Sequence, residues 1–152
     1  MRISDDRRRI LQAGGLTLTV GLAGCLDFLQ EEIEFDDEVP DEVADHLSNA
    51  NNVDGSITDR TGEAELTIEN GPDGDLAYDP ALVAIDVGTT VTWDWQSNGH
   101  TVTSDSAPGD TEFDVSGNNG QEFTETFDEP GNVLYYCNPH RGAGHVGALI
   151  VE

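Results

Sequence analysis

Positive charge is nearly missing from this chain of 152 residues. It has no lysine and only six arginines, against 31 aspartates and glutamates, which gives a formal net charge of −25. Such an excess of negative charge argues against nucleic-acid binding, because phosphate backbones repel it. The charge is typical of the acidic surfaces of salt-loving proteins. Docking to a basic partner is the alternative, although near 1 M salt a Debye length of about 3 Å would weaken long-range steering.

The sequence also lacks a hydrophobic run that could cross a membrane. Its most apolar stretch, residues 10–24, is interrupted by Gln12 and by glycines and threonines. At about 1.5 Å per residue it would reach about 22 Å, which is short of the roughly 30 Å hydrocarbon core. Because Arg7, Arg8 and Arg9 precede it, residues 1–24 are predicted to be a signal peptide. Residues 6–12 resemble a twin-arginine export signal, which implies export in a folded state.

Cysteine is scarce, since the chain has only Cys25 and Cys137. Residues 22–25, Leu-Ala-Gly-Cys, resemble a lipobox. We therefore expect Cys25 to carry a lipid and to anchor the chain at the extracytoplasmic face of the cell membrane. Cys137 then has no disulfide partner, although disulfides form in that compartment. Its thiol is therefore expected to be buried or to bind something.

Residues 25–52 are predicted to be an acidic tether. Its first part, residues 26–39, is rich in carboxylates, whose mutual repulsion favours an extended chain. A short helix is possible over residues 41–50, with Val43, Ala44 and Leu47 as its apolar face. His46 falls on the polar side of this helix, so we expect it to be solvated and not to be a metal ligand.

Residues 53–152 are predicted to form one all-β domain. Apolar residues that recur at every second position indicate strands with one buried face: Ala64, Leu66 and Ile68; Val83, Ile85 and Val87; Val91, Trp93 and Trp95. Residues 121–127 and 132–137 are interpreted as another pair of strands, joined through residues 128–131. Residues 146–151 are almost wholly apolar, as expected for a strand buried between two layers. Short strands separated by Gly, Pro and Asp turns favour an antiparallel sandwich or barrel.

Three of the four histidines cluster around the lone thiol in the sequence. His100 follows the Trp-rich strand, and His140 and His145 follow Cys137. Pro139 stiffens the turn that brings His140 back toward Cys137. One thiolate with two imidazoles is the trigonal donor set of a blue-copper centre, which accommodates both Cu(I) and Cu(II). The cluster therefore predicts an electron-transfer site that holds one copper ion.

The chain resembles the halocyanin and plastocyanin branch of the cupredoxins from about residue 52 to residue 151. The resemblance rests on residues 52–62, Tyr78-Asp79-Pro80, residues 88–93, Gly99-His100-Thr101-Val102 and residues 130–140. It implies a cupredoxin-like, antiparallel Greek-key β-sandwich or barrel. It also implies that His100, Cys137 and His140 are copper ligands. At the position of Thr101, a hydroxyl or amide can brace the Cys loop with a hydrogen bond.

The axial methionine of that family is missing here. Eight residues after Cys137, where the family pattern has Met, this chain has His145, and its only methionine is Met1. We expect His145 to be a fourth ligand, which would stabilise Cu(II), lower the reduction potential and shift the centre toward a tetragonal or tetrahedral geometry. The alternative is an unligated His145, with an axial contact only from the Gly99 carbonyl.

Two other functions compete with electron transfer. One Cys and three His also make a closed tetrahedral set for Zn²⁺, so a structural zinc site or a copper carrier is the main alternative. An enzyme is not expected, because the signature motifs of common hydrolases and nucleotide enzymes are absent and four protein ligands would close the metal to substrate. The expected partners are redox proteins of a membrane electron-transport chain, which the protein would meet as a lipid-anchored monomer.

Overall fold

The computed structural model describes residues 32–152. The predicted signal peptide, the lipidated Cys25 and the first part of the tether lie outside the described residues. The described elements, in chain order, are α1 (Asp41–His46), β1 (Thr58–Asp59), β2 (Glu65–Asn70), η2 (Pro72–Gly74), β3 (Tyr78–Asp79), β4 (Leu82–Ile85), β5 (Thr90–Trp95), β6 (His100–Ser106), β7 (Asp114–Gly117), β8 (Glu122–Thr126), β9 (Gly131–Tyr136), η3 (Asn138–Ala143) and β10 (Val146–Val151). In this part of the chain, no helix has the length and hydropathy that a membrane span requires.

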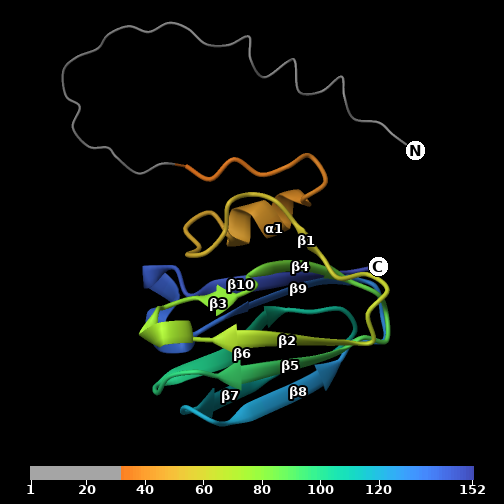
Figure 1. Ribbon diagram of the computed structural model, residues 1–152. Coiled ribbons are helices and arrows are strands. Elements are labelled where there is room, and N and C mark those ends of the chain that lie inside the picture. Colours follow the sequence, from red (N-terminus) through yellow and green to blue (C-terminus); the bar gives the residue numbers. More distant parts are fainter. Residues whose placement is uncertain (1–31) are drawn as a thin grey trace, which may run out of the picture. The chain divides into compact units, whose positions relative to one another are not determined.

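The strands form two facing sheets, which confirms the predicted β-sandwich (Figure 1). One sheet has the order β1-β4-β10-β9-β6-β7 and the other β3-β2-β5-β8. Both sheets are mixed, because β1 and β10 pair in parallel with β4, and β2 pairs in parallel with β5. The predicted antiparallel pairing therefore holds for most strand pairs but not for these three.

The predicted strands at 121–127 and 132–137 both form, but they do not pair with each other. β8 pairs with β5 in one sheet, and β9 pairs with β10 and β6 in the other. The reason lies in their burial. In β9, Val133 and Tyr135 face the core between the sheets while Leu134 faces a second apolar cluster, so this strand needs cover on both faces. β8 has no fully buried residue and lies at the edge of its sheet.

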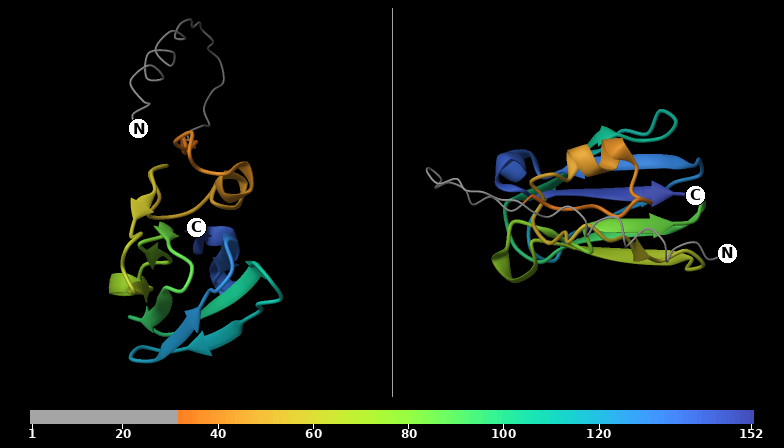
Figure 2. Two further views of the ribbon diagram at one scale, coloured as in Figure 1. Left: turned by 90° about the vertical axis from the view of Figure 1, so that its right-hand side faces the viewer. Right: turned by 90° about the horizontal axis from the view of Figure 1, so that it is seen from above.

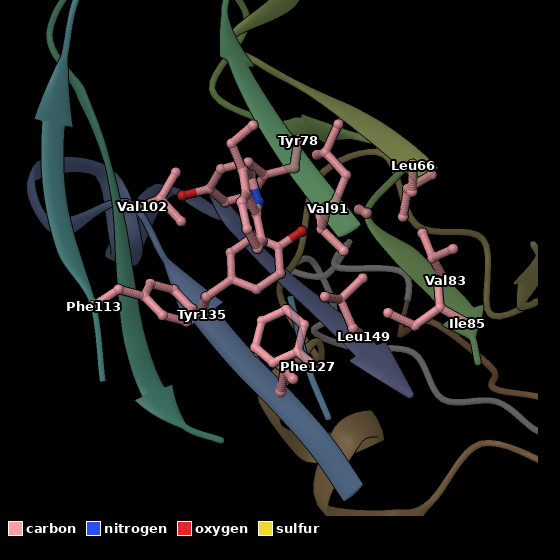
Figure 3. Packing of buried hydrophobic residues seen from close by; sticks show 14 of the residues in the cluster. Leu66, Tyr78, Val83, Ile85, Val91, Val102, Phe113, Phe127, Tyr135 and Leu149 are labelled. Atoms are coloured by element: carbon pink, nitrogen blue, oxygen red, sulfur yellow. The ribbon is translucent and has the colours of Figure 1, made fainter. Parts of the chain in front are cut away.

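The main core lies between the two sheets (Figure 3). Trp93 is completely buried; its ring stacks on Phe123 with centroids 5.5 Å apart and meets Tyr135 edge-on at 5.3 Å. Such aromatic pairs add about 0.5–1.5 kcal/mol each beyond the burial of their apolar area. The period-2 pattern predicted the inward faces of β2, β4 and β5 correctly. It fails at Ala64, which is exposed just before β2, and at Val87, which lies past the end of β4 and is 41% exposed.

A second, smaller core lies on the outer face of the six-stranded sheet. There α1 packs over β9 and β10, as the right-hand view of Figure 2 shows from above. Val39, Val43 and Leu47 are buried against Leu134 and Ala148. From Glu32 onward, the segment predicted to be an extended tether therefore belongs to the folded unit. Burial of its few apolar side chains outweighs the repulsion between its carboxylates, which point outward.

The expectation for His46 is also corrected. Its side chain is only 5% exposed, and its Nε2 lies 2.9 Å from the Tyr135 carbonyl oxygen and 3.1 Å from that of Gly147. The Nε2–H group thus binds two adjacent strands, β9 and β10, and links α1 to the sheet. As expected, His46 does not belong to the group of possible metal ligands in the described part of the chain, which consists of His100, Cys137, His140 and His145.

Candidate metal centre

The four predicted ligands come together at one end of the sandwich. His100 is the first residue of β6, Cys137 follows β9, His140 lies in η3 and His145 precedes β10. One ligand atom from each of the four lies within 4.8 Å of the others. His100 is 37 positions from Cys137 and 45 positions from His145 in the chain. They lie close together because β6 and β9 are hydrogen-bonded neighbours and β9 runs antiparallel to β10.

The distances between donor atoms are those of a set that shares one ion. The Sγ atom of Cys137 lies 3.4 Å from Nδ1 of His140 and 3.9 Å from Nδ1 of His100, and the two Nδ1 atoms are 3.3 Å apart. Metal–nitrogen and metal–sulfur bonds of about 2.0 and 2.3 Å place neighbouring ligand atoms about 3.3–3.8 Å apart in trigonal or tetrahedral geometry. The residues present therefore fit a single copper ion.

His145 is buried with one ring nitrogen bound and the other free. Its Nε2 lies 2.9 Å from Oδ1 of Asn70, an oxygen that can only accept, so Nε2 carries the proton. Nδ1 is then an acceptor, and it has no hydrogen-bond partner among the described residues although it is inaccessible to solvent. A buried nitrogen without a partner is costly, and a bound metal would satisfy it.

Sequence reasoning missed Asn70, although a signal for it was present. Asn70 continues the alternation of Leu66 and Ile68, so it points into the interior, where it is completely buried. A polar residue at an inward position of a strand needs a polar partner there. Asn70 has two, because its Nδ2 also donates to the Thr101 carbonyl oxygen at 3.4 Å.

His100 is held in the tautomer that a ligand needs. The Ser97 hydroxyl donates to the Gly71 carbonyl oxygen at 2.7 Å and lies 2.8 Å from Nε2 of His100. Because its one proton is engaged with Gly71, this hydroxyl accepts a hydrogen bond from Nε2–H. Nδ1 of His100 is left with its lone pair toward the cluster. Ser97 was not predicted either.

Thr101 braces the thiol loop, as the family resemblance implied. Its backbone N–H donates to Sγ of Cys137 at 3.3 Å, and its hydroxyl accepts from the Asn138 N–H at 2.8 Å. Cys137 itself is completely buried and forms no disulfide. Gly99, the other predicted supporting residue, has a φ of 82° just before β6, and its N–H donates to Oδ1 of Asn118 at 3.0 Å.

The segment after α1 also supports the ligand loop. The Asn51 side chain donates to the carbonyl oxygens of Leu76 at 2.7 Å and Ala143 at 2.8 Å, and its backbone N–H donates to Gly144 at 2.9 Å. Gly144 directly precedes His145 and has a φ of 96°, which favours glycine. Residues that sequence reasoning placed in a tether thus hold the backbone next to a ligand.

Burial sets the protonation of the metal-free cluster. It lowers the pKa of His145 to about 3, with further lowering from His100 and His140, and it lowers the pKa of His100, with further lowering from His140. Burial also raises the pKa of the Cys137 thiol. The imidazoles of His100 and His145 are therefore neutral and ready to bind at pH 7, whereas the thiol gives up its proton when a metal binds.

His140 lies nearer the surface than the other three ligands, which are buried. The adjacent Arg141 is 47% exposed; it donates to Asp105 Oδ2 at 3.1 Å, and its guanidinium lies 4.0 Å from the centre of the Tyr136 ring. These contacts hold a positive charge next to the most accessible ligand, on an otherwise strongly acidic chain.

Comparison with known proteins shows the family to which this chain belongs. Residues 64–152 match the model of the copper-binding proteins of the plastocyanin/azurin family, and this match includes all four candidate ligands. The chain belongs to the plastocyanin/azurin family. Its cofactor is accordingly one copper ion, and it is a copper-binding electron carrier of the cupredoxin type. The segment around α1 precedes the part matched by the family model.

Individual relatives agree with this assignment. The chain is 38% identical to a halocyanin from Natronomonas pharaonis over the full length of both chains. It is 31% identical to a plastocyanin from Scenedesmus fuscus, over 58% of this chain and all of that one. Among solved structures, a mutant amicyanin in its oxidized form superposes with a TM-score of 0.50 at 23% identity, over 61% of this chain and 87% of that one, a likeness that concerns the fold alone.

Proposed function

We propose that this member of the plastocyanin/azurin family carries single electrons at the outer face of a membrane, with copper held by His100, Cys137, His140 and His145. Copper supplies the one-electron Cu(I)/Cu(II) couple. Hydrogen bonds from separate strands and loops hold the side chains of His100, Cys137 and His145 in place, so that little atomic rearrangement accompanies a change of charge.

The observation that supports the fourth ligand is the state of the His145 ring. Asn70 binds Nε2, and Nδ1 is buried among the other donors without a partner. An imidazole binds a metal more strongly than the thioether that the family uses. We therefore infer a centre with a lower reduction potential than a methionine at this position would give.

The proposed location and partners rest on the N-terminal sequence. Export through the twin-arginine signal and lipidation at Cys25 would tether the folded domain to the membrane. Donor and acceptor would then be membrane redox proteins that approach the most accessible ligand, His140. Labelling with a radioactive fatty acid in the source cells, followed by membrane fractionation, tests the anchor; Cys25→Ser should abolish both the label and the membrane association.

Spectroscopy of the copper-loaded protein tests the ligand set. We expect an intense charge-transfer band from thiolate to Cu(II), and a copper hyperfine splitting in electron paramagnetic resonance that changes in His145→Gln. His46→Gln is the matched control, since His46 is also largely buried but lies outside the cluster. A narrow splitting that is unchanged in His145→Gln would count against ligation by His145.

Metal preference tests the competing function. The set of one thiolate and three imidazoles also suits Zn²⁺ in a closed tetrahedral site. A protein that purifies with zinc, stays colourless with copper and shows no reversible one-electron couple would refute electron transfer and favour a structural or metal-carrying role.

A further inference from the structure

A row of hydroxyl groups connects the thiol loop with a surface carboxylate. The Asn138 N–H lies 2.8 Å from Thr101 Oγ1, which lies 2.8 Å from Thr103 Oγ1, which lies 2.9 Å from Oδ1 of Asp114. Thr101 and Thr103 are buried on β6, and Asp114 is exposed on the neighbouring strand β7. Asn138 and Thr101 directly follow the ligands Cys137 and His100 in the chain, whereas Asp114 lies at the far end of the row.

The chemistry of the two ends determines the direction of every hydrogen bond in the row. The Asn138 amide can only donate, and an ionised Asp114 carboxylate can only accept. The single hydroxyl proton of Thr103 is therefore used toward Asp114. Since Thr103 has no second proton, the hydroxyl of Thr101 is the donor in the bond between the two threonines.

This direction matters because Thr101 is next to the copper thiolate. Its backbone N–H already donates to Sγ of Cys137, and its hydroxyl oxygen accepts from the N–H of Asn138, the residue that directly follows Cys137. A hydrogen bond to a copper thiolate withdraws electron density from sulfur and so favours Cu(I) over Cu(II). A Thr101 hydroxyl proton free to turn toward Sγ would add one such bond.

We propose that Thr103 and Asp114 are positioning residues that hold the Thr101 hydroxyl proton away from Cys137 Sγ and thereby keep the reduction potential low. This inference rests on the proposed electron-transfer function. Asp114 is not a copper ligand, but it influences the thiolate through the hydroxyl groups of Thr103 and Thr101. The low potential expected from His145 and the orientation of Thr101 then act in the same direction.

Two pairs of variants of the full-length, copper-loaded protein test the proposal. Thr103→Val removes the acceptor for Thr101 without changing charge or branching, whereas Thr103→Ser keeps the hydroxyl. Asp114→Val and Asp114→Asn both remove the negative charge, but only Asn keeps an oxygen that can accept from Thr103. The two Thr103 variants differ in the hydroxyl group that accepts from Thr101. The two Asp114 variants have the same charge and differ in the oxygen that accepts from Thr103, so a difference between them cannot come from the loss of charge.

We expect Thr103→Val to raise the reduction potential relative to Thr103→Ser, and Asp114→Val to raise it relative to Asp114→Asn. In each pair the Cu(I)-to-Cu(II) ratio at a fixed applied potential should rise about fivefold, the factor that corresponds to one typical net hydrogen bond. The thiolate-to-Cu(II) band should also move to higher energy, because the extra hydrogen bond stabilises the sulfur orbitals. A change in packing alone would not predict both shifts.

Equal potentials and equal band positions within both pairs would overturn the proposal. If one variant fails to fold, the other pair still decides, because Thr103 is buried and Asp114 is exposed. The failure of the proposed function would look different, since the unaltered protein would then lack the charge-transfer band and the reversible couple. An unaltered protein with both properties, together with insensitive variants, would refute only the role of Thr103 and Asp114.

Discussion

Replacement of Asn70 by leucine should weaken copper binding through the ring of His145. In the structure, Oδ1 of Asn70 accepts from Nε2–H of His145 at 2.9 Å, and this bond leaves the lone pair of Nδ1 for the metal. Leucine has a similar volume but no acceptor. Without one, the imidazole of the metal-free protein can move its proton to Nδ1, and that proton has to leave before copper binds.

The expected size of the effect follows from these contacts. Loss of a partner that orients a ligand histidine typically lowers metal affinity about 10- to 100-fold, which corresponds to about 1.4–2.8 kcal/mol. Asn70→Leu also removes the bond from Nδ2 to the Thr101 carbonyl oxygen, but that bond is long, at 3.4 Å. Most of the loss should therefore come from His145.

Competition with a chelator of known copper affinity measures the effect, and Asn70→Asp is the matched control. Aspartate also loses the bond to Thr101 but keeps an oxygen that accepts from Nε2–H, so its Cu(II) affinity should stay at or above that of the unaltered protein. If Asn70→Leu binds copper as tightly as the unaltered protein, then Asn70 does not hold His145 as a ligand.

Three shorter predictions concern stability and the ligand surroundings. Leu47→Ala should lower the free energy of unfolding by about 2–5 kcal/mol, because Leu47, directly after α1, is completely buried in the smaller core, whereas Ser48→Ala at an exposed position should change it little in the same urea titration. In the metal-free protein, the pKa of His145 is lowered from 6.5 to about 3, so its stabilising contribution is complete above pH 6.5 and is lost as pH falls toward 3. Thermal melts across this range should therefore fall less steeply in His145→Gln, and parallel curves would contradict the shift. Gly71→Ala should distort the site, since φ is +78° and a Cβ would lie 2.5 Å from Nε2 of His100; an unchanged visible spectrum would count against this contact.

Much of the fold was predictable because a half-buried strand imposes an alternating pattern on its residues. Leu66 and Ile68, and Trp93 and Trp95, point inward as the alternation predicted. The apolar run of β10 is buried on both faces, as expected for a strand between two layers. Strand pairing was harder to predict, because the pattern of one strand says which face is buried but does not name its neighbour.

Composition alone did not predict the conformation of the acidic segment before residue 53. Its charge favours an extended chain, yet Val39 and Val43 are buried in the smaller core. Only a few apolar residues in the right register were needed to bind the segment to the sheet, and a matching apolar surface on β9 and β10 had to exist. That surface forms only when the sheet has assembled, so local sequence could not reveal it.

The sequence by itself determined the chemistry of the site, because a thiol and imidazoles at Cys137, His140 and His100 bind metal through atoms that no other residue types supply. It also raised His145 as the replacement for a methionine. Only the tertiary structure decided which way the His145 ring is turned. Its partner Asn70 is 75 positions away in the other sheet, and the packing of two layers, not the pattern within either strand, brings the two side chains together.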